Sequence, residues 1–317
     1  MSGEFVHAYL ITMRPYLLFV SGITGIVGMA LAPPIPLGPS LLLGAVFFLS
    51  YGFGQALTDC FQLDTDSLSA PYRPLVQGRV GRRDVMLVSV LGLSVSGLVV
   101  VSYNLLNLPL AALAVLGLAT YTPFKRIWWS GPFYNAWIVA LLCLIGYAAA
   151  TGAGNGALGW SGALGGVLVA VFFGYANFVL TGYYKDISAD RTTGYRTLPV
   201  AFGTKRSAVA SSLFALAEIS GCVWAAVAAV SAGTNILQLG AIPFAVAGTY
   251  SAVLAQLRLR RVSERDAHKA IAPVVQAYLL LLSAIAVLAR PTWLPVLVLF
   301  YAGFLVALKL RPMQSQI

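Results

Sequence analysis

Long apolar runs, separated by short polar or basic segments, follow one another along almost the whole chain. A membrane-spanning helix needs roughly 20 mostly apolar residues. Candidate spans cover residues 15–33, 40–58, 85–103, 107–121, 132–152, 162–184, 207–230, 236–256, 272–289 and 292–308. The pattern therefore predicts an all-α polytopic membrane bundle of nine or ten transmembrane helices. The number depends on the short run 107–121 and on whether Arg290-Pro291 separates two final spans or kinks one hairpin.

Composition agrees with this architecture and excludes a soluble fold. The mean hydropathy is +0.84, 59% of residues are hydrophobic and only 9% are charged. Because no polar domain or long linker interrupts the runs, residues 1–317 are expected to form a single domain. The first run is long enough to span and precedes no small-residue cleavage site, so we expect it to be retained. The segment 257–270 is expected to form a partly amphipathic cytoplasmic helix.

Basic residues are distributed unevenly between the two sides of the predicted bundle. In a ten-span arrangement all the basic loops except the one with Arg290 fall on one side, which positive charge assigns to the cytoplasm. The net charge of +10 is thus interpreted as topology and attraction to the lipid bilayer, and no basic, aromatic-interleaved stripe indicates nucleic acid. The many Arg, Ala, Gly and Val residues favour a bacterial source, and hence a bacterial plasma membrane.

Two polar loops, after the second and sixth spans, hold half of the chain's ten acidic residues. The first contains Asp59, Asp64 and Asp66, and the second contains Asp186 and Asp190. If the second span continues as a helix, then Gln55, Asp59, Gln62 and Asp66 share one stripe, whereas Asp64 points away. Carboxylates without His or Cys clusters favour a hard cation, so the loops predict a Mg²⁺ site that joins a substrate phosphate.

Basic residues beside these loops extend the predicted site to a diphosphate. Fixed cationic charge lowers the barrier to ionising an allylic diphosphate because it binds the departing form more strongly than the intact one. The carbocation then needs a dry apolar chamber, which a helix bundle in lipid supplies. The alternative is that both loops are ordinary solvated connections. The basic residues that would bind phosphate oxygens are Arg73, Lys125, Lys185 and Arg196.

A short motif recurs four predicted helices apart. Tyr72-Arg73-Pro74-Leu75 in the first acidic loop is echoed by Tyr195-Arg196-Thr197-Leu198-Pro199 after the second. The echo predicts a duplicated four-helix unit that places the two acidic loops opposite each other. The alternative is that all cytoplasmic loops are basic and the likeness has no further meaning.

These residues resemble the motifs of the UbiA superfamily of intramembrane prenyltransferases. Asp186-Ile187-Ser188-Ala189-Asp190-Arg191, followed by Gly194 and Arg196-Thr197-Leu198-Pro199, is similar to the family's second motif, and Tyr121-Thr122-Pro123 with Lys125-Arg126 is similar to its loop after helix four. The resemblance spans most of the chain. It implies a mostly nine-helix bundle, Mg²⁺, and transfer of a prenyl group from an isoprenoid diphosphate to a lipophilic or aromatic acceptor.

The first acidic motif departs from the family pattern. Thr58 stands at the family's Asn and Gln62 at its first Asp, so that Asp66 alone remains of the two spaced aspartates, with Asp59 and Asp64 nearby. A carboxamide offers an oxygen without a charge, so the metal is expected to be held less tightly. An altered first motif is also compatible with relatives that cyclise the prenyl diphosphate without an acceptor, as terpene cyclases do.

The residues expected in the site follow from these patterns. Asp59, Asp66, Asp186 and Asp190 are the predicted metal ligands and catalytic residues. Predicted substrate-binding residues are Arg73, Lys125, Lys185, Arg196, Asn177, Gln62 and Tyr121. Glu218, the one acidic residue inside an apolar span, would either orient an acceptor and assist proton removal or pack between helices. A transporter would need acidic residues throughout the membrane interior, and this chain offers only Glu218.

Overall fold

The structure is a computed structural model that describes residues 3–152, 159–230 and 236–311, and no strand is present in those ranges. Its long helices are α1 (Gly3–Met13), α2 (Leu18–Leu31), α3 (Leu37–Asp59), α5 (Arg82–Tyr103), α6 (Asn107–Lys125), α7 (Ser130–Thr151), α8 (Gly162–Gly182), α10 (Leu198–Val230), α11 (Ala241–Leu259), α12 (His268–Ala289) and α13 (Leu294–Lys309). Two short helices, α4 (Leu63–Ser69) and α9 (Ile187–Thr192), lie in the acidic loops.

The predicted membrane bundle is confirmed. Within the described residues nine helices are long and apolar enough to cross a membrane, and a bent pair, Gly3–Met13 with Pro15–Leu31, makes a possible tenth. The pair bends by 46° at Arg14. At 1.5 Å per residue, the 14 residues of α2 span only about 21 Å, short of a hydrocarbon core of roughly 30 Å. The run 107–121 belongs to a full span, and Arg290-Pro291 separates two spans.

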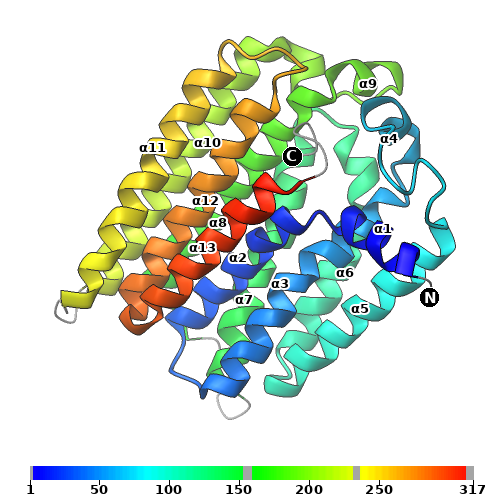
Figure 1. Cartoon of the computed structure of the whole chain (residues 1–317). Helices are drawn as coiled ribbons and strands as arrows, with labels where there is room; N and C mark the ends of the chain where they lie inside the picture. Colours follow the sequence, from blue (N-terminus) through cyan, green and yellow to red (C-terminus); the bar gives the residue numbers. More distant parts are fainter. Residues whose placement is uncertain (1–2, 153–158, 231–235, 312–317) are drawn as a thin grey trace.

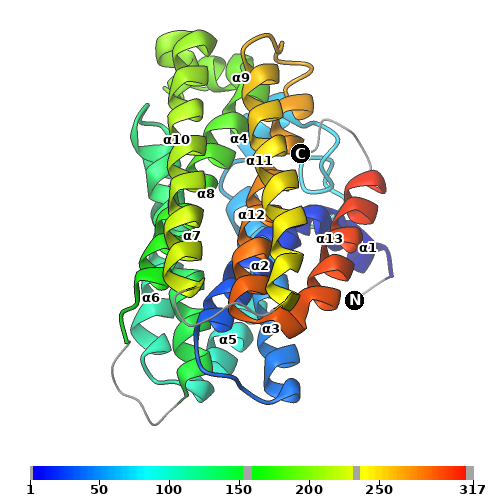
Figure 2. The same ribbon diagram turned by 90° about the vertical axis from the view of Figure 1, so that its left-hand side faces the viewer.

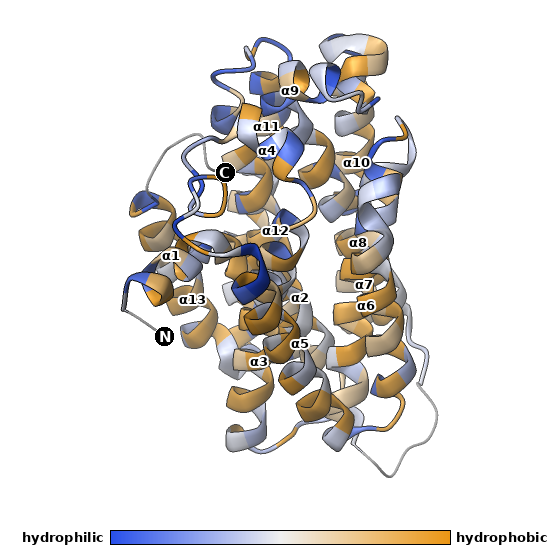
Figure 3. Cartoon of the chain, turned by 90° about the vertical axis from the view of Figure 1, so that its right-hand side faces the viewer, coloured by the Kyte–Doolittle hydropathy of each residue, from blue (hydrophilic) through white to orange (hydrophobic). Residues whose placement is uncertain are grey.

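The two ends of the bundle differ in polarity. The connections after α3, α8 and α11, including α4 and α9, gather at the upper end in Figure 1. Hydrophilic colouring concentrates at this end in Figure 3, whereas the helices below it are mostly apolar. The two acidic loops therefore lie at the same end of the molecule, as the topology of basic residues predicted.

Helices α2, α7, α8 and α12 form the centre of the bundle. The two most buried spans are α12 and α8, consistent with helices that are apolar on all sides. Helices α8 and α10 lie side by side, as do α11 and α12 (Figure 2). The crossing of α2 with α7 depends on glycine, because a Cβ at Gly28 would collide with the Cys143 carbonyl and one at Gly146 with the Gly25 carbonyl. Backbones that approach so closely admit no larger residue at either position.

Gly146→Val tests this central crossing. The added side chain has to displace backbone rather than a flexible side chain, so we expect a loss of about 3 kcal/mol or more of stability. Thermal unfolding in detergent, followed by circular dichroism, measures it. Gly44→Val in α3 is the matched control, because nothing lies within 4 Å of a Cβ built there. Equal unfolding temperatures for the two variants would contradict the close crossing.

The order of neighbours agrees with the predicted duplication. Helix α2 packs on α3, α3 on α5, α5 on α6 and α6 on α7. Four spans later the same sequence of contacts recurs, with α7 on α8, α8 on α10, α10 on α11 and α11 on α12. The first span of each unit, α2 and α7, meet at the centre.

The prediction of a helix over 257–270 is wrong. Helix α11 ends at Leu259, residues 260–267 form turns, and α12 begins at His268. Ser263 causes this locally, since its hydroxyl accepts the Asp266 backbone N–H at 3.3 Å and donates to the Asp266 carboxylate at 3.2 Å. Such short-range side-chain bonds compete with helical bonds. The segment 260–267 therefore forms a compact polar turn beside α9.

Candidate active site

The first acidic loop begins where α3 ends. The prediction of one continuous helical stripe is wrong, because α3 stops at Asp59 and α4 starts only at Leu63, with Gln62 at φ −123° and ψ 23°. Residues 60–62 interrupt the helix between α3 and α4, but the four residues of the predicted stripe still lie on one side. Gln55, Asp59, Gln62 and Asp66 all line one cavity.

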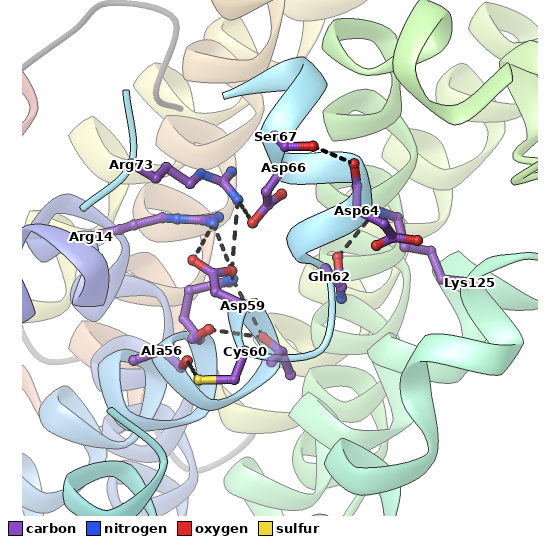
Figure 4. Close-up of polar contacts among 12 residues, drawn as sticks. Arg14, Ala56, Asp59, Cys60, Gln62, Asp64, Asp66, Ser67, Arg73 and Lys125 are labelled. Carbon is purple, nitrogen blue, oxygen red and sulfur yellow. Dashed lines mark hydrogen bonds and ion pairs between the residues drawn. The ribbon is translucent and has the colours of Figure 1, made fainter. Parts of the chain in front are cut away.

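Asp59 is held by the guanidinium of Arg14, a residue that was not among the predicted site residues. Arg14 Nη2 donates to both carboxylate oxygens at 2.9 Å, and Gln55 Nε2 donates to Oδ1 at 2.6 Å (Figure 4). Arg14 reaches Asp59 from the bend between α1 and α2, where its φ of 54° is unusual for a residue other than glycine. Both side chains are buried, and removing one partner of a buried pair costs about 3–5 kcal/mol. Arg14 therefore fixes the position of Asp59.

Asp66 lies beside a second buried guanidinium. Arg73 Nη1 forms an ion pair with Asp66 Oδ2 and lies 3.8 Å from Asp59 Oδ1. Desolvation raises the pKa of the Asp66 carboxyl above its ordinary value, and the charge of Arg73 opposes that rise. Asp64 instead points to the outside, where it pairs with Arg126 at 3.6 Å. The prediction that Asp64 lies off the stripe is confirmed.

The second acidic loop presents two carboxyls from the start of α9. Asp186 is the N-cap residue but its side chain makes no capping bond, and the backbone N–H of Asp190 donates to its carbonyl at 2.7 Å. Asp190 is fully buried. Its Oδ2 accepts the Thr197 hydroxyl at 3.0 Å, and its Oδ1 has no hydrogen-bond partner among the described residues. Desolvation raises the pKa of Asp190 to about 7, against the opposing charge of Lys125.

Lys125, at the end of α6, joins the two loops. Its Nζ donates to Gln62 Oε1 at 3.2 Å, and it lies 5.8 Å and 5.1 Å from the ring centroids of Tyr183 and Tyr195. Among acidic side chains, Asp190 and Asp186 interact most strongly with its charge. Because Gln62 belongs to the first loop and Asp190 to the second, one buried ammonium connects both.

A cavity of about 230 Å³ opens between these loops and runs down among α3, α5, α6, α7 and α8. Its upper end contains Arg14, Asp59, Asp66, Lys125 and Asp186. Its lower part is lined almost entirely by apolar and small residues, among them Phe47, Gly97, Val100, Ala114, Leu118 and Ile138. A charged end above an apolar chamber fits an amphiphile with an anionic head.

The remaining predicted residues divide between the cavity and its surroundings. Tyr121 and Lys185 line the cavity, and the Tyr121 hydroxyl lies 3.3 Å from that of Tyr183. Arg196 is exposed and lines neither described cavity, and its backbone N–H donates to the Arg126 carbonyl at 3.1 Å. Asn177 accepts the Ser211 hydroxyl at 2.6 Å, which ties α8 to α10.

Glu218 lies apart from the acidic loops. It is buried between α10 and α8, its carboxyl within 2.7 Å of where a Cβ on Gly174 would be, and Tyr278 of α12 lies equally close to that point. Its Oε1 has no hydrogen-bond partner in the described part of the chain. Because Glu218 lines neither described cavity, its position favours the helix-packing role among the two predicted.

The donor atoms of the second loop fit a hard cation that shares its shell with a ligand. The Oδ1 of Asp190 lacks a hydrogen-bond partner among the described residues, although Asp190 lines neither described cavity, and Asp186 lines both. Asp59 and Asp66, in contrast, are engaged by guanidinium groups. Within residues 3–152, 159–230 and 236–311 no three His, Cys, Asp or Glu side chains form a group that could hold an ion. A Mg²⁺ ion here would need phosphate oxygens and water to complete its shell.

The fold and this cavity together define an integral membrane protein with a site for an amphiphile whose anionic head lies at one membrane surface. Residues 21–272 match the family model described as the UbiA prenyltransferase family, which covers most of the chain. The chain belongs to the UbiA prenyltransferase family, as its motifs predicted. It is therefore an intramembrane prenyltransferase.

Individual relatives agree with this assignment. The digeranylgeranylglyceryl phosphate synthase of Thermococcus kodakarensis is 29% identical over 267 residues, which cover 83% of this chain and 91% of the relative. The enzyme of that name from Halobacterium salinarum is 29% identical over 194 residues, 60% of this chain and 65% of the relative. These sources are archaeal, so they give no support to the predicted bacterial membrane.

Solved structures show the same fold. A UbiA homologue from Aeropyrum pernix, in its apo form, superposes with a TM-score of 0.66 at 20% identity over 92% of this chain and 98% of the homologue. A UbiA homologue from Archaeoglobus fulgidus, bound to GPP and Mg²⁺, gives a TM-score of 0.65 at 18% identity over 89% of this chain and 99% of the homologue. In that homologue a prenyl diphosphate and the metal are bound together.

Proposed function

We propose that this prenyltransferase ionises an isoprenoid diphosphate at the charged end of the cavity and transfers the prenyl group to the hydroxyl of a lipophilic acceptor. The supporting observation is the meeting of both acidic loops on Lys125, directly above an apolar chamber. A diphosphate placed there lies among buried cations while its hydrocarbon chain enters the chamber. The basic loops around this end favour a cytoplasmic orientation.

The chain's own residues bind and orient the donor. Lys125, Lys185 and Arg73 provide cationic groups around the place of the diphosphate. When the allylic C–O bond breaks, its electron pair leaves with pyrophosphate, and cations held in a dry site stabilise that growing charge. Apolar walls exclude water from the carbocation that remains. Arg14 acts through Asp59, as a positioning residue.

The proposed reaction depends on Mg²⁺. Asp190 and Asp186 would hold the ion, and Asp66 and Asp59 of the first loop would contribute further oxygens to its shell. Held by these residues, the ion would add positive charge beside the leaving group. Bound Mg²⁺ beside GPP in the Archaeoglobus fulgidus homologue supports this assignment.

The acceptor proposed is a glycerol phosphate lipid that already has one ether-linked prenyl chain. The support is the name that the archaeal relatives share, digeranylgeranylglyceryl phosphate synthase. In this step the glycerol oxygen bonds to the allylic carbon, the bond from that carbon to pyrophosphate breaks, and the hydroxyl proton passes to the departing pyrophosphate. An ether forms and nothing is oxidised or reduced.

Product analysis tests the proposal. Purified protein in lipid nanodiscs is incubated with Mg²⁺ and geranylgeranyl diphosphate, alone, with the glycerol phosphate lipid, and with a hydroxybenzoate. We expect a dialkyl ether only with the glycerol lipid, and no product in the presence of a chelator. A cyclic hydrocarbon formed from the diphosphate alone would contradict the transfer reaction. It would favour the alternative terpene cyclase, with which Gln62 in the first motif is also compatible. A prenylated hydroxybenzoate would replace the lipid with an aromatic acceptor.

A further inference from the structure

A second cavity, of about 470 Å³, lies next to the first at the polar end of the bundle. It is enclosed by α4, α9, the turn 260–267 and the first residue of α12. Arg73, Lys185 and Asp186 line both cavities, so they form a common wall. A ligand in one cavity is therefore separated from a ligand in the other by single side chains.

The second cavity differs from the first in lacking an apolar chamber. Around it are Arg73, Lys185, Arg265 and His268, with hydroxyl groups on Tyr72 and Thr192. Its apolar side chains are one leucine and two alanines. The charged and hydroxyl-bearing side chains that make up the rest of its lining favour a compact polar group.

The charge of this cavity favours an anion. The acidic residues that line it are Asp186 and Glu264. Glu264 is already engaged, because its Oε1 accepts the Ser188 backbone N–H at 2.8 Å and its Oε2 accepts the Ser188 hydroxyl at 2.6 Å. These bonds fasten the turn 260–267 to α9 and hold Arg265, the next residue, at the rim.

Two buried nitrogen atoms at this cavity lack partners among the described residues. One is Nε of Arg73, a side chain that is more than nine-tenths buried, and the other is Nδ1 of His268. Buried polar atoms without partners are rare, because each costs the free energy of its lost hydration. His268 also begins a 22-residue helix, and the dipole of that helix places partial positive charge at this end. These observations point to an oxyanion ligand.

We infer that the second cavity binds the phosphate group of the acceptor lipid, with Arg265 and His268 as specificity-determining residues. The inference rests on the proposed function. It places the acceptor's phosphate across the common wall of Arg73, Lys185 and Asp186 from the donor's diphosphate. Recognition of a phosphomonoester here would select an acceptor that retains its phosphate over one that has lost it.

Arg265→Gln and His268→Gln test the assignment in nanodiscs. We expect each to raise KM for the phosphorylated acceptor about tenfold or more, since a charge-assisted hydrogen bond is lost. KM for the prenyl diphosphate and kcat at saturating acceptor should stay unchanged. An acceptor lipid without phosphate should bind weakly and equally to all forms. Arg261→Gln is the matched control, because Arg261 is exposed in the same turn and does not line the cavity.

Other outcomes would overturn the assignment. If the two variants weaken inhibition by pyrophosphate while KM for the acceptor stays constant, the cavity receives the leaving group instead. Equilibrium binding of the acceptor lipid, with and without its phosphate, separates this inference from the proposed function. An enzyme that makes hydrocarbon alone refutes the transfer reaction, whereas equal binding of both lipids to wild type and Arg265→Gln refutes the phosphate site.

Discussion

Asp190→Asn should lower the rate of pyrophosphate release at saturating Mg²⁺ by about a thousandfold or more, because the site loses a charged ligand that the departing diphosphate needs nearby. The amide keeps the size of the carboxyl. Burial already raises the pKa of Asp190 to about 7, so the fold tolerates an uncharged group there and the variant should remain folded. Release of pyrophosphate from geranylgeranyl diphosphate, measured in nanodiscs, gives the result.

The control for this prediction is Asp64→Asn in the other acidic loop. Asp64 lies at the surface and its pairing with Arg126 spans 3.6 Å between half-exposed side chains, an interaction that contributes little. Its replacement should leave turnover near that of the wild type. If Asp190→Asn matched Asp64→Asn, the assignment of Asp190 to the metal would be wrong.

Lys125→Met should lower kcat/KM for the prenyl diphosphate by about a hundredfold or more, since a buried cation at the leaving group is among the strongest electrostatic contributions to catalysis. Lys125 is only 6% exposed, so solvent screens its charge weakly. The loss should appear in both kcat and KM, because the same charge binds the intact diphosphate and the departing pyrophosphate. Steady-state kinetics with varied donor concentration measures both.

Two further variants make the Lys125 result specific. Lys125→Arg keeps a positive charge and should restore a measurable part of the activity, which a purely structural defect would not allow. Arg126→Gln removes the neighbouring charge, which is half-exposed, and should leave kcat/KM almost unchanged. Similar losses for Lys125→Met and Arg126→Gln would show that general loop charge, rather than the buried ammonium, binds the donor.

The membrane spans were predictable because hydropathy along a single helix is a local property. All ten predicted ranges overlap a described helix. The bend at Arg14, just before the first range, was not predicted. The meeting of the acidic loops was predictable from motif resemblance and from the shared face of the bundle. The turn 260–267 was not predictable, because it depends on two hydrogen bonds between Ser263 and Asp266, one donated and one accepted by the serine hydroxyl.

Arg14 shows what the sequence does not reveal. Its partner Asp59 is 45 residues away, and the contact exists only because the backbone adopts a left-handed φ at the bend before Pro15. A basic residue directly before a proline at the start of a span was the one available signal. Arg196 is a different case, because its place in a motif predicts substrate contact and the structure places it on the surface, where the role stays a prediction.

The pairing of Gln62 with Lys125 has a consequence for turnover. The Gln62 carboxamide oxygen accepts a hydrogen bond from the Lys125 ammonium without neutralising its charge. The charged end of the cavity is therefore one unit more positive than it would be with an aspartate at position 62. Such a field draws in a polyanion strongly at low dielectric. The same field would attract inorganic pyrophosphate, so we expect glutamine at this position to speed capture of the substrate and to slow release of the product.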